Sequence, residues 1–178
     1  PSTWNSPPGN STAADRLALV ALSGLEEFRP VYDGLAGMEV FNPSPEAMRR
    51  PQAPTPGDPL RRDGSNIASV LERLRHSSPE TERRVEEYLR AIVPGIRSVR
   101  SSAVSGWETL EFQQDVSGSV GPWSFPASAV SDGTLRALGV LVALFAGTGE
   151  ALSPVGVEEP EIALHPAAAG VLLDAIRD

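Results

Sequence analysis

The spacing of apolar residues predicts a chain that mixes helices with short strands. Five segments carry apolar residues at helical intervals: residues 13–25, 67–74, 79–93, 135–146 and 166–176. Five shorter segments have the apolar pattern of strands: residues 38–41, 98–104, 108–113, 116–125 and 152–157. A Ser105-Gly106 pair between two of these strands suits a hairpin turn. The order of elements predicts the α/β class.

Two segments stand out from this pattern by composition. Residues 135–146 are apolar nearly all round, and a helix without a polar face is expected to be buried. Residues 43–59 hold six of the seventeen prolines. Because each proline removes a backbone donor and fixes φ, this stretch is predicted to be an extended connector without regular structure.

Charge and composition exclude several classes of function. The chain of 178 residues has a net charge of −8, so it is not expected to attract nucleic acid or anionic lipid non-specifically. It contains no cysteine, which excludes disulfides and thiol catalysis. All fifteen basic residues are arginine, so a Schiff-base lysine and a complete P-loop are excluded as well. The longest apolar stretch is too short to cross a bilayer, and no membrane partner is expected.

The composition divides the chain into three predicted regions. Residues 1–37 are an N-terminal segment with one helix and a partly disordered start, and residues 38–104 hold the connector and a helical, lid-like region. Residues 105–178 carry the buried helix and the last strand. The chain opens with proline rather than methionine and ends inside a helical pattern, so we expect it to be a segment of a longer protein.

The first candidate site is Ser131-Asp132-Gly133, directly before the buried helix. Serine and aspartate are favoured at helix N-caps, and glycine lets a backbone approach a ligand closely. A helix N-terminus presents free N–H groups and a partial positive charge, which together bind anions. An ordinary helix cap is the alternative interpretation of the same residues.

The second candidate site is Glu158-Glu159, which follows the apolar run at residues 152–157. A buried strand that ends in two acids delivers carboxylates to its C-terminal edge, where open α/β sheets bind ligands. One glutamate can hold hydrated Mg²⁺, and the other can orient or deprotonate a water. A solvated acidic turn is the alternative. His165 heads the last predicted helix, where it is a cap or surface residue, a ligand or a proton carrier.

Taken in order, VSDGTLRALGVLVAL and VGVEEPEIALHP resemble the C-terminal half of an ABC-type ATPase head. The resemblance is to bacterial AAA-family ATPases grouped with RecF, SMC heads and the overcoming-lysogenization-defect (OLD) nucleases. NPSPEAMRRPQ, LRRDGSNIASVLERL and YLRAIVPGI are similar to the middle region of those proteins. The resemblance covers roughly residues 38–178, and it implies part of a P-loop NTPase sheet with a helical insertion.

The resemblance implies a role for each candidate residue. Ser131-Asp132-Gly133 would be the signature motif, which contacts the γ-phosphate of ATP bound to the partner subunit. Glu158 would be the Walker B acid that supports Mg²⁺, and Glu159 the catalytic glutamate that activates water. Residues 161–165 would form the D-loop, with His165 in place of its usual aspartate. Glu158 also departs from the commoner aspartate, and no Gly-rich loop with lysine occurs in the chain.

The resemblance implies an ATP-binding and hydrolysing switch that forms a homodimer through its ATP sites. Such a protein is cytoplasmic and serves DNA repair or phage defence, and DNA is a further partner that the resemblance allows. A chain without the P-loop is expected to bind nucleotide poorly, because its amides and lysine neutralise the phosphates. Two alternatives stay open: a non-catalytic interaction domain, and a metal hydrolase site built from Glu158, Glu159, Glu161 and His165.

Overall fold

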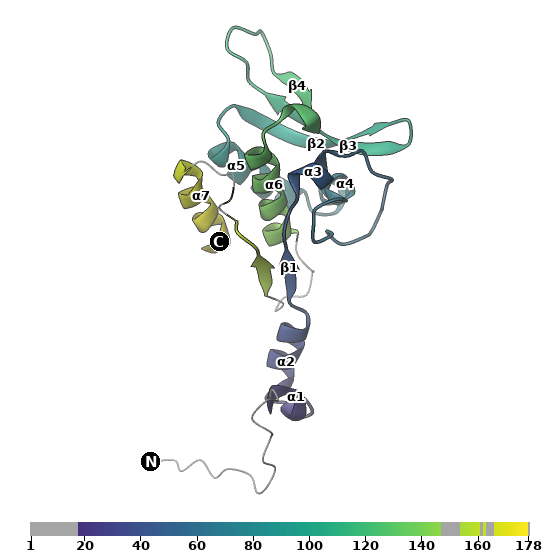
Figure 1. The fold of residues 1–178 in the computed structure, drawn as a ribbon, viewed down its shortest axis with the longest axis vertical. Helices are drawn as coiled ribbons and strands as arrows, with labels where there is room; N and C mark the ends of the chain where they lie inside the picture. Colours follow the sequence, from purple (N-terminus) through teal and green to yellow (C-terminus); the bar gives the residue numbers. More distant parts are fainter. Residues whose placement is uncertain (1–17, 147–153, 161, 163–165, 178) are drawn as a thin grey trace, which may run out of the picture.

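The computed structural model describes residues 18–146, 154–160, 162 and 166–177. Within them the chain is a mixed α/β structure with a small parallel sheet and an antiparallel sheet (Figure 1). The strands are β1 (Glu39–Phe41), β2 (Ile96–Val104), β3 (Trp107–Gln114), β4 (Trp123–Pro126) and β5 (Val155–Val157). The helices are α1 (Ala18–Leu22), α2 (Arg29–Ala36), α3 (Pro45–Arg49), α4 (Ile67–Ser77), α5 (Pro79–Ile92), α6 (Asp132–Phe145) and α7 (Pro166–Arg177), with a 3₁₀ turn η1 (Ala127–Ala129).

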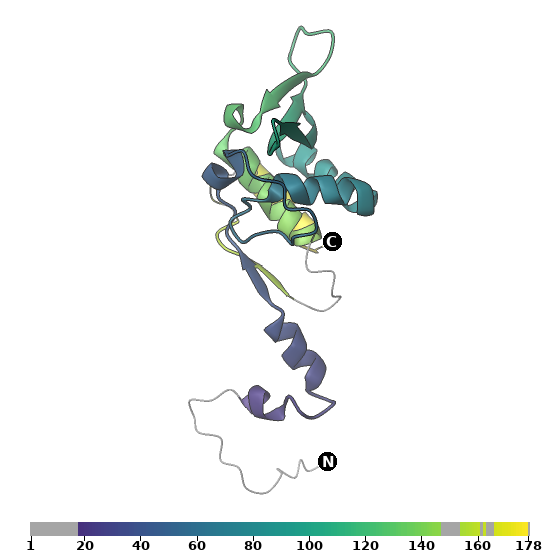
Figure 2. The same ribbon diagram turned by 90° about the vertical axis from the view of Figure 1, so that its right-hand side faces the viewer.

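Helix α6 lies at the centre of the structure, as both views show (Figures 1 and 2). Residues 134–143 are all buried, which confirms the burial predicted from the apolar composition of this segment. The helix packs against α5 and α7 and also contacts α3 and β5. Leu138 and Leu141 of α6 are fully buried, as are Val85 and Leu89 of α5. The core is therefore built around one apolar helix.

The two sheets have different topologies. β1 and β5 pair in parallel, with Phe41 opposite Val157, although the two strands are far apart in the sequence. β2, β3 and β4 form an antiparallel sheet in that order, with the predicted hairpin turn between β2 and β3. Helices α4 and α5 pack against β2. The parallel pair brings the segment after α2 beside the strand that precedes α7.

Two helices were not predicted from the sequence. α3 lies inside the proline-rich connector, so the prediction that this stretch lacks regular structure was wrong for five residues. Pro45 occupies the first turn of α3, where no backbone donor is needed, and the Ser44 side chain accepts a hydrogen bond from the Ala47 amide. α2 has no buried residue and, with α1, projects away from the other elements (Figures 1 and 2).

Of the helix predicted at residues 13–25, the structure describes the part from residue 18 onward, and α1 lies in it. None of the described helices combines the length and the apolar content that a bilayer crossing requires.

Gly139 sets the distance between α6 and the segment that follows β1. A Cβ placed on Gly139 would lie 2.4 Å from Cβ of Pro43, whose ring cannot move aside. We predict that Gly139→Ala lowers the free energy of unfolding by about 1–3 kcal/mol, since overpacking outweighs the gain in helix propensity.

Gly170→Ala is the matched control, because a Cβ on Gly170 of α7 meets nothing within 4 Å. This substitution is expected to raise the free energy of unfolding by up to about 1 kcal/mol. Urea denaturation of both variants measures the difference. Equal effects of the two substitutions would contradict the close packing of α6.

Candidate functional site

The ends of β1 and β5 place two polar residues side by side. Because the strands are parallel and in register, Asn42 and Glu158 both follow at the same edge of the sheet. The Glu158 amide donates a hydrogen bond to the Phe41 carbonyl at 2.9 Å and extends the ladder by one step. Asn42 Nδ2 then donates to Glu158 Oε2 at 2.8 Å. The Glu158 carboxylate is therefore oriented from the neighbouring strand.

Glu159 turns the chain away from the sheet. Its φ angle is +44°, in the left-handed region that a residue with a side chain adopts only at a cost. The Glu159 carbonyl accepts a hydrogen bond from the Ile162 amide at 3.1 Å, and the residue itself is exposed. Strained backbone of this kind persists where the surrounding structure holds it, and it is concentrated at functional sites.

Ser131 is the N-cap of α6. Its Oγ accepts a hydrogen bond from the Thr134 amide at 3.1 Å and lies 2.9 Å from the Thr134 hydroxyl. Ser131 and Asp132 are exposed, and Gly133 is half-buried. The cap occupies the Thr134 amide, and the amides before it in the first turn have no acceptor within the helix ladder. The prediction of a cap is confirmed, and anion binding at this end stays a prediction.

Arg49 of α3 holds the first residue of α6 in place. Its Nη2 donates to the Val130 carbonyl at 2.9 Å and forms an ion pair with the Asp132 carboxylate. Arg49 therefore balances the charge of Asp132 beside the positive end of the helix dipole. The N-terminus of α6 is fixed from two directions, by its own cap and by α3.

Arg136 joins the two candidate sites. It lies one turn after Asp132 in α6 and has only 8% of its surface exposed. Its Nη2 donates to the carbonyls of Glu158 at 3.1 Å and Glu159 at 3.2 Å, and to Asn42 Oδ1 at 3.3 Å. One guanidinium group thus reaches the turn after β5 and the residue after β1.

The donor set of this edge suits the chemistry of a phosphate ester bound with a divalent cation. The Glu158 carboxylate offers the oxygen ligands that Mg²⁺ prefers. The exposed Glu159 carboxylate can accept a hydrogen bond from a water, and the first turn of α6 can donate to an anion. Among the described residues, no three His, Asp or Glu side chains are grouped closely enough to hold a metal ion by themselves.

Sequence reasoning identified Glu158, Glu159 and Ser131-Asp132-Gly133 but missed Asn42 and Arg136. Both carried a signal: Asn42 ends its strand as Glu158 does, and Arg136 is the one charged residue inside the otherwise apolar segment 135–146. His165 and Glu161 lie outside the described residues.

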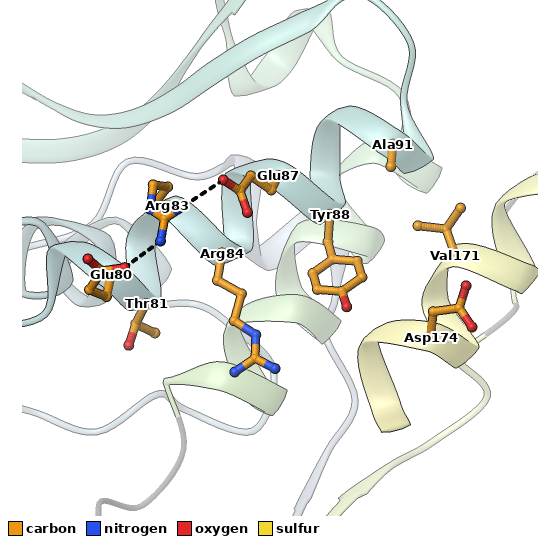
Figure 3. Close-up of a pocket in the computed structure, with 9 residues that line it drawn as sticks. All are labelled: Glu80, Thr81, Arg83, Arg84, Glu87, Tyr88, Ala91, Val171 and Asp174. Atoms are coloured by element: carbon orange, nitrogen blue, oxygen red, sulfur yellow. Dashed lines mark hydrogen bonds and ion pairs between the residues drawn. The ribbon is translucent and has the colours of Figure 1, made fainter. Parts of the chain in front are cut away.

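A separate open cavity of about 500 Å³ lies between α5 and α7 (Figure 3). Arg83 forms ion pairs there with Glu80 at 2.5 Å and Glu87 at 3.0 Å. The hydrogen bond from Arg83 lowers the pKa of the Glu80 carboxyl. The cavity is also lined by Arg84 of α5, whose guanidinium lies over the Phe145 ring at 4.5 Å from the ring centre. The predicted site residues do not line this cavity.

Comparisons of the chain with models of known protein families, with curated proteins and with solved structures found no match.

The positive φ of Glu159 gives a testable consequence for stability. Glu159→Val is expected to lower the free energy of unfolding by about 1–2 kcal/mol, because a β-branched residue is least tolerated in the left-handed region. Glu159→Gly is expected to cost nothing, since glycine adopts this conformation freely. Denaturant unfolding of both variants tests this, and an equal loss in both would show that the conformation of Glu159 is not strained.

Proposed function

We propose that these 178 residues form the signature and Walker B part of an ABC-type ATPase similar to RecF, SMC heads and OLD nucleases. The phosphate-binding loop of this ATPase would lie outside them, because the chain has no lysine. The observation that supports the proposal best is the contact network of Arg136. It links the end of β5, with Glu158 and Glu159, to the helix that begins at Ser131.

Glu158 is the residue that we propose to hold Mg²⁺. Its carboxylate lies at the carboxyl edge of a parallel sheet, is exposed, and is oriented by the Asn42 amide. These features fit a hydrated hard cation, which needs few protein oxygens and keeps several waters. Mg²⁺, when bound, would neutralise charge on the β- and γ-phosphates of ATP.

Glu159 is the proposed general base. An exposed carboxylate on a strained turn can accept a hydrogen bond from a water that attacks the γ-phosphate, and it can take the proton of that water. Glu159 leaves the ladder while Glu158 continues it, so the two carboxylates serve different roles. His165 stays a proposed D-loop residue on the resemblance alone.

Ser131, Asp132 and Gly133 are proposed to bind the γ-phosphate of ATP that a second copy carries. The N-terminus of α6 is a rigid end of the core helix, and its exposed cap can meet an anion that another subunit presents. The proposal includes a homodimer that closes over ATP and opens after hydrolysis. We propose a cytoplasmic switch in DNA repair or phage defence, with DNA as a further partner.

The isolated chain of 178 residues is predicted to have no measurable ATPase activity. Positioning of the phosphates by P-loop amides and lysine supplies most of the catalysis, and the chain has neither. A phosphate-release assay with purified chain and Mg·ATP checks this. Steady turnover that Glu159→Gln abolishes would contradict the prediction and favour a self-sufficient site.

In the protein that joins this segment to a P-loop, which we call the complete ATPase, two variants should separate the two candidate sites. Glu159→Gln is expected to lower hydrolysis by about two to four orders of magnitude while preserving ATP-dependent dimerisation. Ser131→Arg is expected to block dimerisation and hydrolysis but to spare nucleotide binding. The fold should survive, because loss of a surface cap costs about 1 kcal/mol.

Sedimentation of both variants with and without ATP measures the contrast. If Ser131→Arg still dimerises with ATP, this residue is a helix cap and nothing more. If the complete protein neither binds nor hydrolyses ATP, the scaffold serves as a non-catalytic interaction domain.

A further inference from the structure

We propose that Arg136 is a positioning residue that fixes the turn carrying Glu159. This inference rests on the proposed function, because it assigns to Arg136 a part in ATP hydrolysis. It goes further by naming the group that sets the geometry of the turn on which the proposed general base lies.

The contacts of Arg136 define the path of the turn after β5. Its Nη2 donates to the successive carbonyls of Glu158 and Glu159, at 3.1 and 3.2 Å. Its Nη1 donates to the Pro43 carbonyl at 3.3 Å, so the guanidinium plane is held from the β1 side as well. Two bonds to adjacent carbonyls orient the two peptide planes that flank the Glu159 Cα, and the relation between these planes defines the left-handed conformation of Glu159.

Arg136 is buried and bound to neutral oxygens. Among the described residues, no carboxylate oxygen lies within 4.0 Å of its guanidinium, and its buried Nε has no hydrogen-bond partner. Such burial is costly, and a buried arginine is ordinarily paired with an acid. The guanidinium group gives the turn after β5 a fixed direction.

Arg136 is itself held in place by α6. It lies one turn after Asp132, and residues 134–143 of this helix are buried. The guanidinium group therefore presents its donors to the turn after β5 from a fixed position. Loss of these donors is expected to shift the Glu159 side chain relative to the attacking water.

Four forms of the complete ATPase test this inference: the parent, Arg136→Lys, Glu159→Gln, and the double variant. Lysine keeps the charge but loses the planar fork that reaches adjacent carbonyls. Arg136→Lys is expected to lower kcat about 10- to 100-fold while KM for ATP and ATP-dependent dimerisation stay at parent values. If Arg136 acts only through Glu159, the double variant hydrolyses ATP at the rate of Glu159→Gln alone.

Arg136→Met and Arg90→Gln complete the set. Methionine replaces the aliphatic part of arginine and has no charge to desolvate, so the variant should fold and should lower kcat as lysine does. Arg90 is an exposed arginine that also donates to a backbone carbonyl, that of Arg97 at 2.8 Å, and its replacement should leave kcat unchanged.

Three outcomes would overturn the inference while leaving the proposed function intact. Arg136→Lys could retain the parent kcat. Alternatively, kcat of the double variant could fall below that of Glu159→Gln by the same factor by which Arg136→Lys alone lowers kcat. Loss of cooperative unfolding in both the lysine and methionine variants would show that Arg136 supports the fold as a whole. A parent-like rate for Glu159→Gln alone would instead overturn the proposed base, and this inference with it.

Discussion

The guanidinium group of Arg136 is buried where α6 meets the ends of β1 and β5, and it donates to neutral oxygens there. Removing this cation from water is costly, and four separate acceptors offset the cost in part. The acceptors come from two stretches of chain that are distant in sequence, residues 42–43 and residues 158–159. One side chain therefore ties the buried helix to both strand ends.

Close packing reinforces this arrangement. Gly139 lets α6 approach Pro43 so closely that no side chain would fit between them, one turn beyond Arg136 on the same helix. Arg49 fixes the N-terminus of α6 through its bonds to Asp132 and Val130. The helix is thus held at its N-terminus and along its first two turns. A helix held in this way keeps its N-terminal amides and the Arg136 guanidinium group in a fixed relation to each other.

The sequence was informative where burial and local pattern determine structure. Continuous apolar composition predicted the burial of α6, the Ser105-Gly106 pair predicted the β2–β3 hairpin, and the acids after β5 predicted the sheet edge. The contacts of Arg136 were not predictable in this way, because the pairing of β1 with β5 determines them. Its acceptor at Pro43 is 93 residues away in sequence. The short helix α3 was missed because the prolines were treated as helix breakers, although proline is favoured in the first turn of a helix.

The structure of the complete ATPase as Glu159→Gln, crystallised with Mg²⁺ and ATP, tests the central claim most directly. The account predicts Mg²⁺ against the Glu158 carboxylate, directly or through one of its waters, and the γ-phosphate facing the carboxamide at position 159. Ser131 of a second copy should contact the same phosphate, with Arg136 still bound to the carbonyls of the turn. Nucleotide bound in the cavity between α5 and α7, or Mg·ATP remote from Glu158, would contradict it.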